Sequence, residues 1–185
     1  GVGKNLLTGF PAEIRLDPAN GSLSLGTSAT SFTSGTTPTL TARMVITSQG
    51  NVGIGTTTPT TKLYVNGDIT ANSVAGTSDS RFKTNIRPVT HALDKVKALQ
   101  GVYFNWNQKA FPEKEFGAQD ELGFIAQEVE KIVPEIVLKD KTKEEYRSVK
   151  YDKLVALLVE AVKEQQKQIE KLQLKVKEMA KTRKK

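Results

Sequence analysis

The side chains best suited to chemistry lie in one short stretch, Ser78-Asp79-Ser80-Arg81-Phe82-Lys83. It brings a hydroxyl, a carboxylate, a guanidinium and an amine close together in the sequence. A serine hydroxyl becomes an effective nucleophile when a neighbouring base takes its proton. A lysine serves as that base only when it is neutral, so its pKa must fall from about 10.4 through burial or nearby positive charge. Serine and lysine are the residue types of Ser–Lys nucleophilic catalysis. The alternative for this stretch, taken by itself, is a capped turn with an ordinary surface lysine.

The spacing of Ser78 and Lys83 restricts how the two groups can meet. Residues five apart do not face each other on a helix, and they point to opposite faces of a strand. They can meet across a turn or between chains, and we expect oligomerisation to assemble the site. Ser80 is the rival nucleophile, because it lies three residues before Lys83. Asp79 and Arg81 are candidates for a supporting role, as a local ion pair or turn or as groups that orient the backbone.

Residues 1–75 have the composition of a β-rich fibre segment. Eleven of the fourteen glycines lie within residues 1–77, where no helical period appears. Short runs of alternating polar and apolar residues are separated by turn dipeptides, a pattern typical of strands. The runs are 13–16, 22–25, 44–46 and 62–65, and the dipeptides are Asn20-Gly21, Gln49-Gly50 and Asn66-Gly67. The alternative is a low-complexity linker.

Two stretches of this segment, 20–27 and 49–56, share the pattern Gly-x-φ-x-φ-Gly-Thr, which predicts stacked short strands. Residues 56–61 read as a bend, and residues 65–71 are expected to form a last β element. Apolar side chains are so sparse that one chain buries too little surface to offset its ordering entropy. We therefore expect the strands to pack against copies of themselves.

Residues 76–150 are expected to form a compact α+β domain. Thr90 is the predicted N-cap of a helix that ends near Gly101. A strand over 102–107 should place Phe104 and Trp106 in the core. The remaining expected elements are a loop over 109–121, a strand over 122–125, a helix over 126–133 stopped by Pro134, and paired strands over 136–138 and 146–149.

A long helix is predicted for residues 151–180, with Asp152 as its cap, and a basic tail follows at 181–185. An apolar heptad seam runs through Val155, Leu158, Val162, Gln165, Ile169, Leu172, Val176 and Met179. β-Branched residues at a with leucine at d favour a dimer. Val159 and Ala161 widen the apolar face and favour a higher oligomer, whereas Leu154 and Leu157 are candidates for packing on the helix's own domain.

The net charge of +7 does not indicate a nucleic-acid partner. Residues 163–185 hold nine Lys or Arg against three Asp or Glu, while residues 78–162 hold fourteen of each. The excess is therefore a solvated helix and tail rather than a basic patch with a reading motif. His91 is the single histidine and the chain has no cysteine, so we expect no metal and no cofactor. No stretch is long and apolar enough for membrane insertion.

Three signatures stand in order: Ser78 to Lys83, then Leu122-Gly123-Phe124-Ile125-Ala126-Gln127-Glu128-Val129, then Tyr151-Asp152-Lys153-Leu154 leading into the heptads. Together, over about residues 76–178, they resemble the autocleaving intramolecular chaperone domain at the C-terminus of phage endosialidases and tail fibres. This domain also occurs in some bacterial surface fibres and in a membrane-bound animal transcription factor. The stretch 50–56 also looks like phage and bacterial fibre shafts.

The resemblance implies a domain that drives trimerisation of the fibre before it and then cuts itself off. Carried onto this chain, it makes Ser78 the nucleophile, Lys83 the base and Thr77–Ser78 the scissile bond. The products would be 1–77, the mature fibre end, and 78–185, the released chaperone.

The expected protein is thus a homotrimeric fibre or adhesin of a phage virion or bacterial surface, ending in a trimeric coiled coil. Residues 1–77 are expected to touch a cell-surface glycan or protein receptor. The alternative is a trimerisation cap that stays attached and does not cleave. The opening Gly1-Val2-Gly3 suggests a piece of a longer chain.

Overall fold

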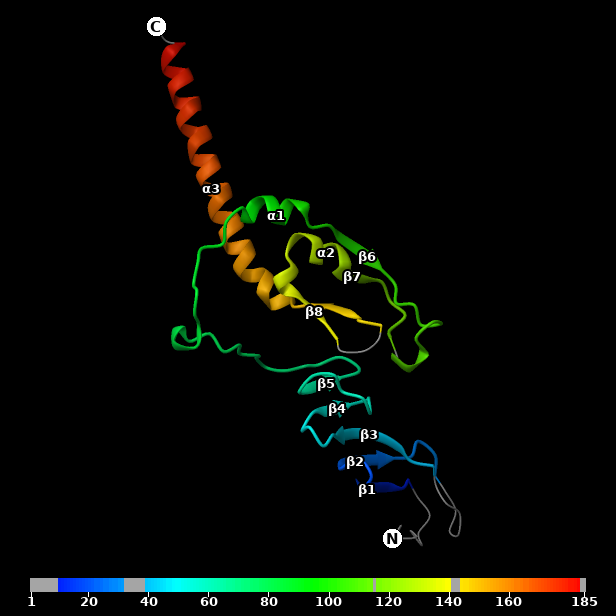
Figure 1. Ribbon diagram of the computed structural model, residues 1–185. Helices are drawn as coiled ribbons and strands as arrows, with labels where there is room; N and C mark the ends of the chain where they lie inside the picture. The colour runs from blue at the N-terminus through cyan, green and yellow to red at the C-terminus, as the bar shows by residue number, and fades with distance from the viewer. Residues whose placement is uncertain (1–9, 32–38, 115, 141–143, 184–185) are drawn as a thin grey trace. The chain divides into compact units, whose positions relative to one another are not determined.

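The computed structural model describes residues 10–31, 39–114, 116–140 and 144–183. The chain divides into two compact units: Gly1–Val74 with Trp106–Ala118, and Ala75–Asn105 with Gln119–Lys185. Figure 1 shows small β-sheets and a long C-terminal helix, so the expected mixed α and β class is confirmed. The loop 106–118, which sequence reasoning assigned to the domain 76–150, clusters with the first unit. Residues 1–9, 184 and 185 of the predicted segments lie outside the described residues.

The first unit is built on a five-stranded sheet in the order β1-β2-β3-β4-β5. Neighbouring strands are antiparallel from β1 to β4, and β4 and β5 are parallel. Gly21 and Gly50 have φ of +66° and +72°, which confirms that these turns need a residue free to adopt the left-handed region. The strands are β1 (Ala12–Asp17), β2 (Ser22–Thr27), β3 (Thr41–Ile46), β4 (Val52–Ile54) and β5 (Leu63–Val65).

Strand register gives this sheet one largely apolar face. Directly paired residues share a face, and the pairs join Ile14 to Leu25, Leu25 to Met44, Met44 to Ile54, and Ile54 to Val65. A second row of pairs parallels it, through Leu16, Leu23, Ile46, Val52 and Leu63. Ile14 and Leu16 are 76% and 75% exposed. Among the described residues of this unit, Val45 is the one large apolar side chain that is buried, so the apolar face lacks cover in a single chain.

The expected β element over residues 65–71 is wrong in part. Strand β5 ends at Val65, and residues 68–71 have no regular structure. Every residue from 67 to 91 is exposed, and the short 3₁₀ turn η1 (Ser80–Phe82) is the one regular element between β5 and the next helix. The stretch that carries the candidate chemistry therefore lies outside all three sheets and outside the hydrophobic core.

The second unit packs three helices and two small hairpins around one core. Helices α1 (Ala92–Ala98) and α2 (Ala126–Ile132) pack with the start of α3 (Tyr151–Thr182). The hairpins pair β6 (Gly101–Phe104) with β7 (Glu121–Phe124), and β8 (Val137–Lys139) with β9 (Arg147–Val149). A further 3₁₀ turn, η3 (Pro134–Ile136), follows α2 where Pro134 was expected to stop it, and η2 (Pro112–Lys114) lies in the first unit. The buried residues are Ala92, Val129, Val133, Ile136, Leu154, Leu157 and Ala161.

Two of the three sequence signatures meet in this unit at Gly123. A Cβ on Gly123 would lie 2.7 Å from the hydroxyl of Tyr151, so only glycine leaves room for the tyrosine. That hydroxyl accepts a hydrogen bond of 3.2 Å from the backbone N–H of Phe124. The Leu-Gly-Phe-Ile and Tyr-Asp-Lys-Leu motifs thus join strand β7 to the first turn of α3.

Helix α3 divides its apolar residues between two faces. Leu154 and Leu157 are 8% and 5% exposed and belong to the domain core, which confirms that part of the helix packs on its own domain. The role expected for Ala161 at the seam is wrong: it is 3% exposed and packs in the same core. The neighbouring seam residues Val155 and Val162 are both 61% exposed.

Three further expectations are wrong. His91, not Thr90, holds the N-cap position of α1, and Lys150, not Asp152, holds that of α3. Neither residue makes a side-chain cap hydrogen bond. Trp106 is 40% exposed and stacks on Phe116 with ring centroids 4.1 Å apart, so it is not a buried core residue.

Replacing Leu157 with alanine should lower the free energy of unfolding of the second unit by about 2–5 kcal/mol, because it removes a buried side chain and leaves a cavity. Urea unfolding at one protein concentration, followed by circular dichroism, measures the change. Lys167→Ala, on an exposed position of the same helix, is the control and should change stability by about 0.5 kcal/mol or less. Equal effects of the two variants would contradict the observed core.

Candidate functional site

The structure brings Ser78 and Lys83 together within one chain. The Nζ of Lys83 donates to the Oγ of Ser78 at 2.7 Å. Sequence spacing allowed a meeting across a turn or between chains, and the turn η1 between the two residues provides the first of these. Lys83 itself has extended backbone, with φ of −118° and ψ of 141°, so its side chain folds back beside the turn.

An ion pair within the turn fixes its shape. Asp79 Oδ1 accepts from the backbone N–H of Arg81 at 2.9 Å and from its Nε at 3.0 Å, and Oδ2 accepts from Nη2 at 2.9 Å. These contacts, the side-chain bond from Arg81 first and its backbone N–H second, hold the pKa of Asp79 below its usual value. The backbone N–H of Lys83 donates to the carbonyl of Ser80 at 3.0 Å and closes the turn. Asp79 and Arg81 thus act together as a local ion pair and a cap.

The two candidate nucleophiles differ in their contacts. The Lys83 amine contacts the Ser78 hydroxyl, whereas Ser80 supplies its backbone carbonyl to the same lysine's N–H. In the described structure the hydroxyl placed beside the candidate base is therefore that of Ser78. Thr77, on the other side of the candidate scissile bond, precedes the turn in the irregular segment.

The residues around the contact between Ser78 and Lys83 are exposed to solvent. Thr77, Ser78 and Lys83 are all exposed, and Arg81 and Phe82 beside them are 81% (side chain) and 73% exposed. A lysine gives up its proton when burial or a like charge destabilises its charged form. The Lys83 amine and the Ser78 hydroxyl are thus in contact, and both residues are open to solvent in the described chain.

All eight predicted seam residues of α3 point away from the domain core. Their exposed fractions run from 41% for Ile169 to 61% for Val155, Val162 and Met179, and Gln165 is exposed with them. The others are Leu158, Leu172 and Val176. The helix therefore presents a row of large apolar side chains to solvent along its length, a surface that ordinarily marks an interaction site.

Sequence reasoning missed one residue that connects these parts, Glu164. Its carboxylate accepts hydrogen bonds from the first two N–H groups of α1. The sequence contained a signal for it. Residues 154, 157, 161 and 164 form a second row at helical spacing, each one position before a residue of the seam.

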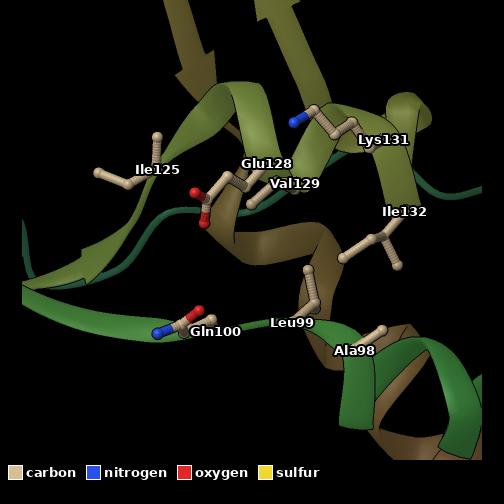
Figure 2. A pocket seen from close by; sticks show the side chains of 8 residues that line it. All are labelled: Ala98, Leu99, Gln100, Ile125, Glu128, Val129, Lys131 and Ile132. Carbon is tan, nitrogen blue, oxygen red and sulfur yellow. The ribbon is translucent and has the colours of Figure 1, made fainter.

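The described residues offer no second centre of chemistry. They contain no group of three side chains able to hold a metal, and none of their helices is long and apolar enough to cross a membrane. A shallow pocket of about 250 Å³ lies between the end of α1 and α2 (Figure 2). Its lining is mostly apolar, with Glu128, Lys131 and Gln100 as its polar side chains, and neither Ser78 nor Lys83 lines it.

Comparison with known proteins identifies the region that holds the site. The family described as chaperone of endosialidase, which is also named as a peptidase, matches residues 78–138. The match begins at Ser78 and includes the Leu122–Val129 signature. The resemblance drawn from the sequence motifs is thereby confirmed: the chain carries a chaperone domain of the endosialidase and tail-fibre type.

The chain is also similar to longer proteins. It is 34% identical over 116 residues to the long tail fiber protein Gp37 of Enterobacteria phages K3 and T2, a match that covers 62% of this chain. An uncharacterized membrane protein of Dictyostelium discoideum is 36% identical over 105 residues, or 50% of this chain. These matches span 9%, 8% and 6% of the relatives' own lengths, so what is shared is one part of much larger proteins.

The pKa of the Asp79 carboxyl should lie below 3.8, because Arg81 stabilises the charged form. Arg81→Gln should raise that pKa toward 3.8, and the turn should lose its stabilisation as the pH falls through the folded-state pKa of Asp79. An NMR titration of the side-chain carboxyl in the Ser78→Ala chain measures both effects. Arg87→Gln, an exposed change in the same segment, is the control, and an equal shift with Arg87→Gln would contradict the assigned pair.

Proposed function

We propose that this chain is the end of a homotrimeric tail fibre whose chaperone domain drives assembly and then cuts the Thr77–Ser78 bond. In this proposal Ser78 is the nucleophile and Lys83 is the base. The observation that carries it is the 2.7 Å contact between the Lys83 amine and the Ser78 hydroxyl, at the start of a segment that matches a chaperone family. The phage relatives support a place in the virion tail fibre.

The cleavage can be written with every atom accounted for. The neutral Lys83 amine takes the proton of the Ser78 hydroxyl, and Oγ attacks the carbonyl carbon of Thr77. The C–N bond breaks, the Ser78 nitrogen receives the proton from Lys83, and an ester joins Thr77 to Oγ. Water then adds to the ester with Lys83 again taking a proton. The products are a carboxyl group on Thr77 and a free α-amine on Ser78, and the hydroxyl and the amine are restored.

Assembly would cover the apolar seam and the Lys83 amine, which are exposed in a single chain. The seam of α3 is exposed along its whole length, and three copies joined along it would bury these side chains. Val159, which flanks the seam at 48% exposure, broadens the apolar face and favours three strands over two. In the trimer a neighbouring copy would cover the turn and exclude water from Lys83, so cleavage would wait for assembly.

The wild-type chain should appear on a denaturing gel as two fragments, 1–77 and 78–185. Ser78→Ala should leave one intact band because no nucleophile remains, and Lys83→Met should do the same because no base remains. Ser80→Ala is the matched control and should still be cut. N-terminal sequencing of the larger fragment, 78–185, should begin at Ser78. A single uncut wild-type band would instead support a trimerisation cap that stays attached.

Val162→Asp should reduce a trimer to monomers, because it places a charge in the apolar seam. Under the proposed mechanism the same variant should remain uncut, since its Lys83 stays in water. Light scattering gives the oligomeric state and a denaturing gel gives the cut fraction. Lys171→Asp, which lies outside the seam, should assemble and cleave. A monomeric Val162→Asp chain cut at the wild-type rate would refute the dependence on assembly.

The ligand of the fibre is a separate prediction. A cell-surface glycan or protein that binds residues 1–77 would fit a tail fibre, and binding of fragment 1–77 to host cells would test it.

A further inference from the structure

Helix α3 carries two rows of residues that run side by side, one position apart. The first row, which we call the domain row, comprises Leu154, Leu157, Ala161 and Glu164, with spacings of three, four and three. Its three apolar members are buried in the core of the second unit. The second row is the exposed seam, which includes Gln165. Every described residue of α3 after Glu164 is exposed. Glu164 is therefore the last residue of the domain row, and beyond it the helix continues with the seam but without contacts to the domain core.

Glu164 caps helix α1 across a separation of 72 residues. Its Oε1 accepts from the N–H of Ala92 at 3.1 Å, and its Oε2 accepts from the N–H of Leu93 at 2.9 Å. Ala92 is fully buried, and the N-cap residue of α1, His91, makes no side-chain cap hydrogen bond. The two N–H groups, that of Leu93 first, hold the pKa of Glu164 below its usual value. The carboxylate is therefore charged at neutral pH and meets the positive end of the helix.

This contact anchors the segment that leads from the candidate base to α1. Residues 84–91 connect Lys83 to the helix, and all of them are exposed. Asn85 and His91 have φ of +53° and +55°, in the left-handed region that non-glycine residues adopt at a cost and keep only when their surroundings hold them there. The contact of Lys83 with Ser78 lies within the exposed segment itself, whereas Glu164 joins the end of the segment to α3.

We propose that Glu164 is a positioning residue for self-cleavage, an inference that rests on the function proposed above. It ties the start of α1 to α3 directly beside Gln165 of the seam, so that assembly of the seam also sets where the segment that follows Lys83 ends. The turn itself sets the contact between Lys83 and Ser78, so Glu164 would position the turn as a whole against the copy that covers it. A displacement of about 1 Å costs roughly a hundredfold in rate. Glu164 acts through α1 and residues 84–91, without touching the scissile bond.

The same helix offers a matched control one turn earlier. Glu160 is also an acidic residue of α3, and its carboxylate pairs with Lys163 at 2.6 Å on the helix surface. Loss of that pair removes a charge from α3 without releasing α1. A comparison of the two positions therefore separates the contact with α1 from a general effect of charge on the helix.

The experiment follows cleavage of the full chain over time after cell-free synthesis, with light scattering on each variant. We expect Glu164→Ala to remain trimeric and to cleave about tenfold more slowly or worse. Glu164→Gln is isosteric and keeps one acceptor oxygen, so its rate should lie between those of Glu164→Ala and the wild type. Glu160→Gln should cleave at the wild-type rate. In the uncut Ser78→Ala background, Glu164→Ala should speed amide hydrogen exchange at Ala92, Leu93 and residues 84–91.

Two results would overturn the positioning role. One is cleavage of trimeric Glu164→Ala at the wild-type rate. The other is that both Glu164 variants lose the trimer and also lose cleavage. Glu164 would then act only by stabilising the assembled fold. If the wild-type chain stays whole, the proposed function itself is refuted. If the wild type and Glu164→Ala are cut equally fast, only the positioning role of Glu164 is refuted.

Discussion

The structure depends on how helix α3 divides its apolar residues between its own domain and solvent. Leu154, Leu157 and Ala161 supply three of the seven buried residues in the hydrophobic core of the second unit. The row one position further along the helix is left exposed by the same packing. A helix with apolar residues on more than one face is stable in water only when each face is covered. One element therefore both builds the core of the domain and leaves an apolar row exposed, because burying one row points the other outward.

The first unit shows the same constraint in a sheet. Its paired strands gather apolar side chains on one face, and Ile14 and Leu16 at the edge of that face remain mostly exposed. The chain contributes too little apolar surface here to cover the sheet itself. Each unit, considered separately, therefore ends in an apolar face without a partner in the described residues. Packing against copies of the same chain, as in our proposal, would cover both faces without any new component.

At the candidate site, the distance between the Lys83 amine and the Ser78 hydroxyl and the protonation of that amine have different physical causes. A local ion pair between Asp79 and Arg81 shapes the turn, and the turn brings the Lys83 amine to the Ser78 hydroxyl. These are short-range contacts that one chain makes without help. Whether the amine accepts a proton depends instead on how much water surrounds it, which is a property of whatever covers the turn. Under the mechanism we propose, the turn would set the distance between the two groups within one chain, and assembly would set the protonation of the amine.

The sequence by itself determined the features that depend on neighbouring residues. The strand runs, the turns at Gly21 and Gly50 and the heptad seam follow from periodicity and short spacing. The resemblance of three ordered motifs to a known family singled out Ser78 and Lys83. Only the tertiary structure decided that Ala161 belongs to the core, that Gly123 makes room for Tyr151, and that Glu164 caps α1. These contacts join residues that lie far apart in the chain, and a local pattern carries no information about which distant side chain will satisfy a helix end or fill a gap.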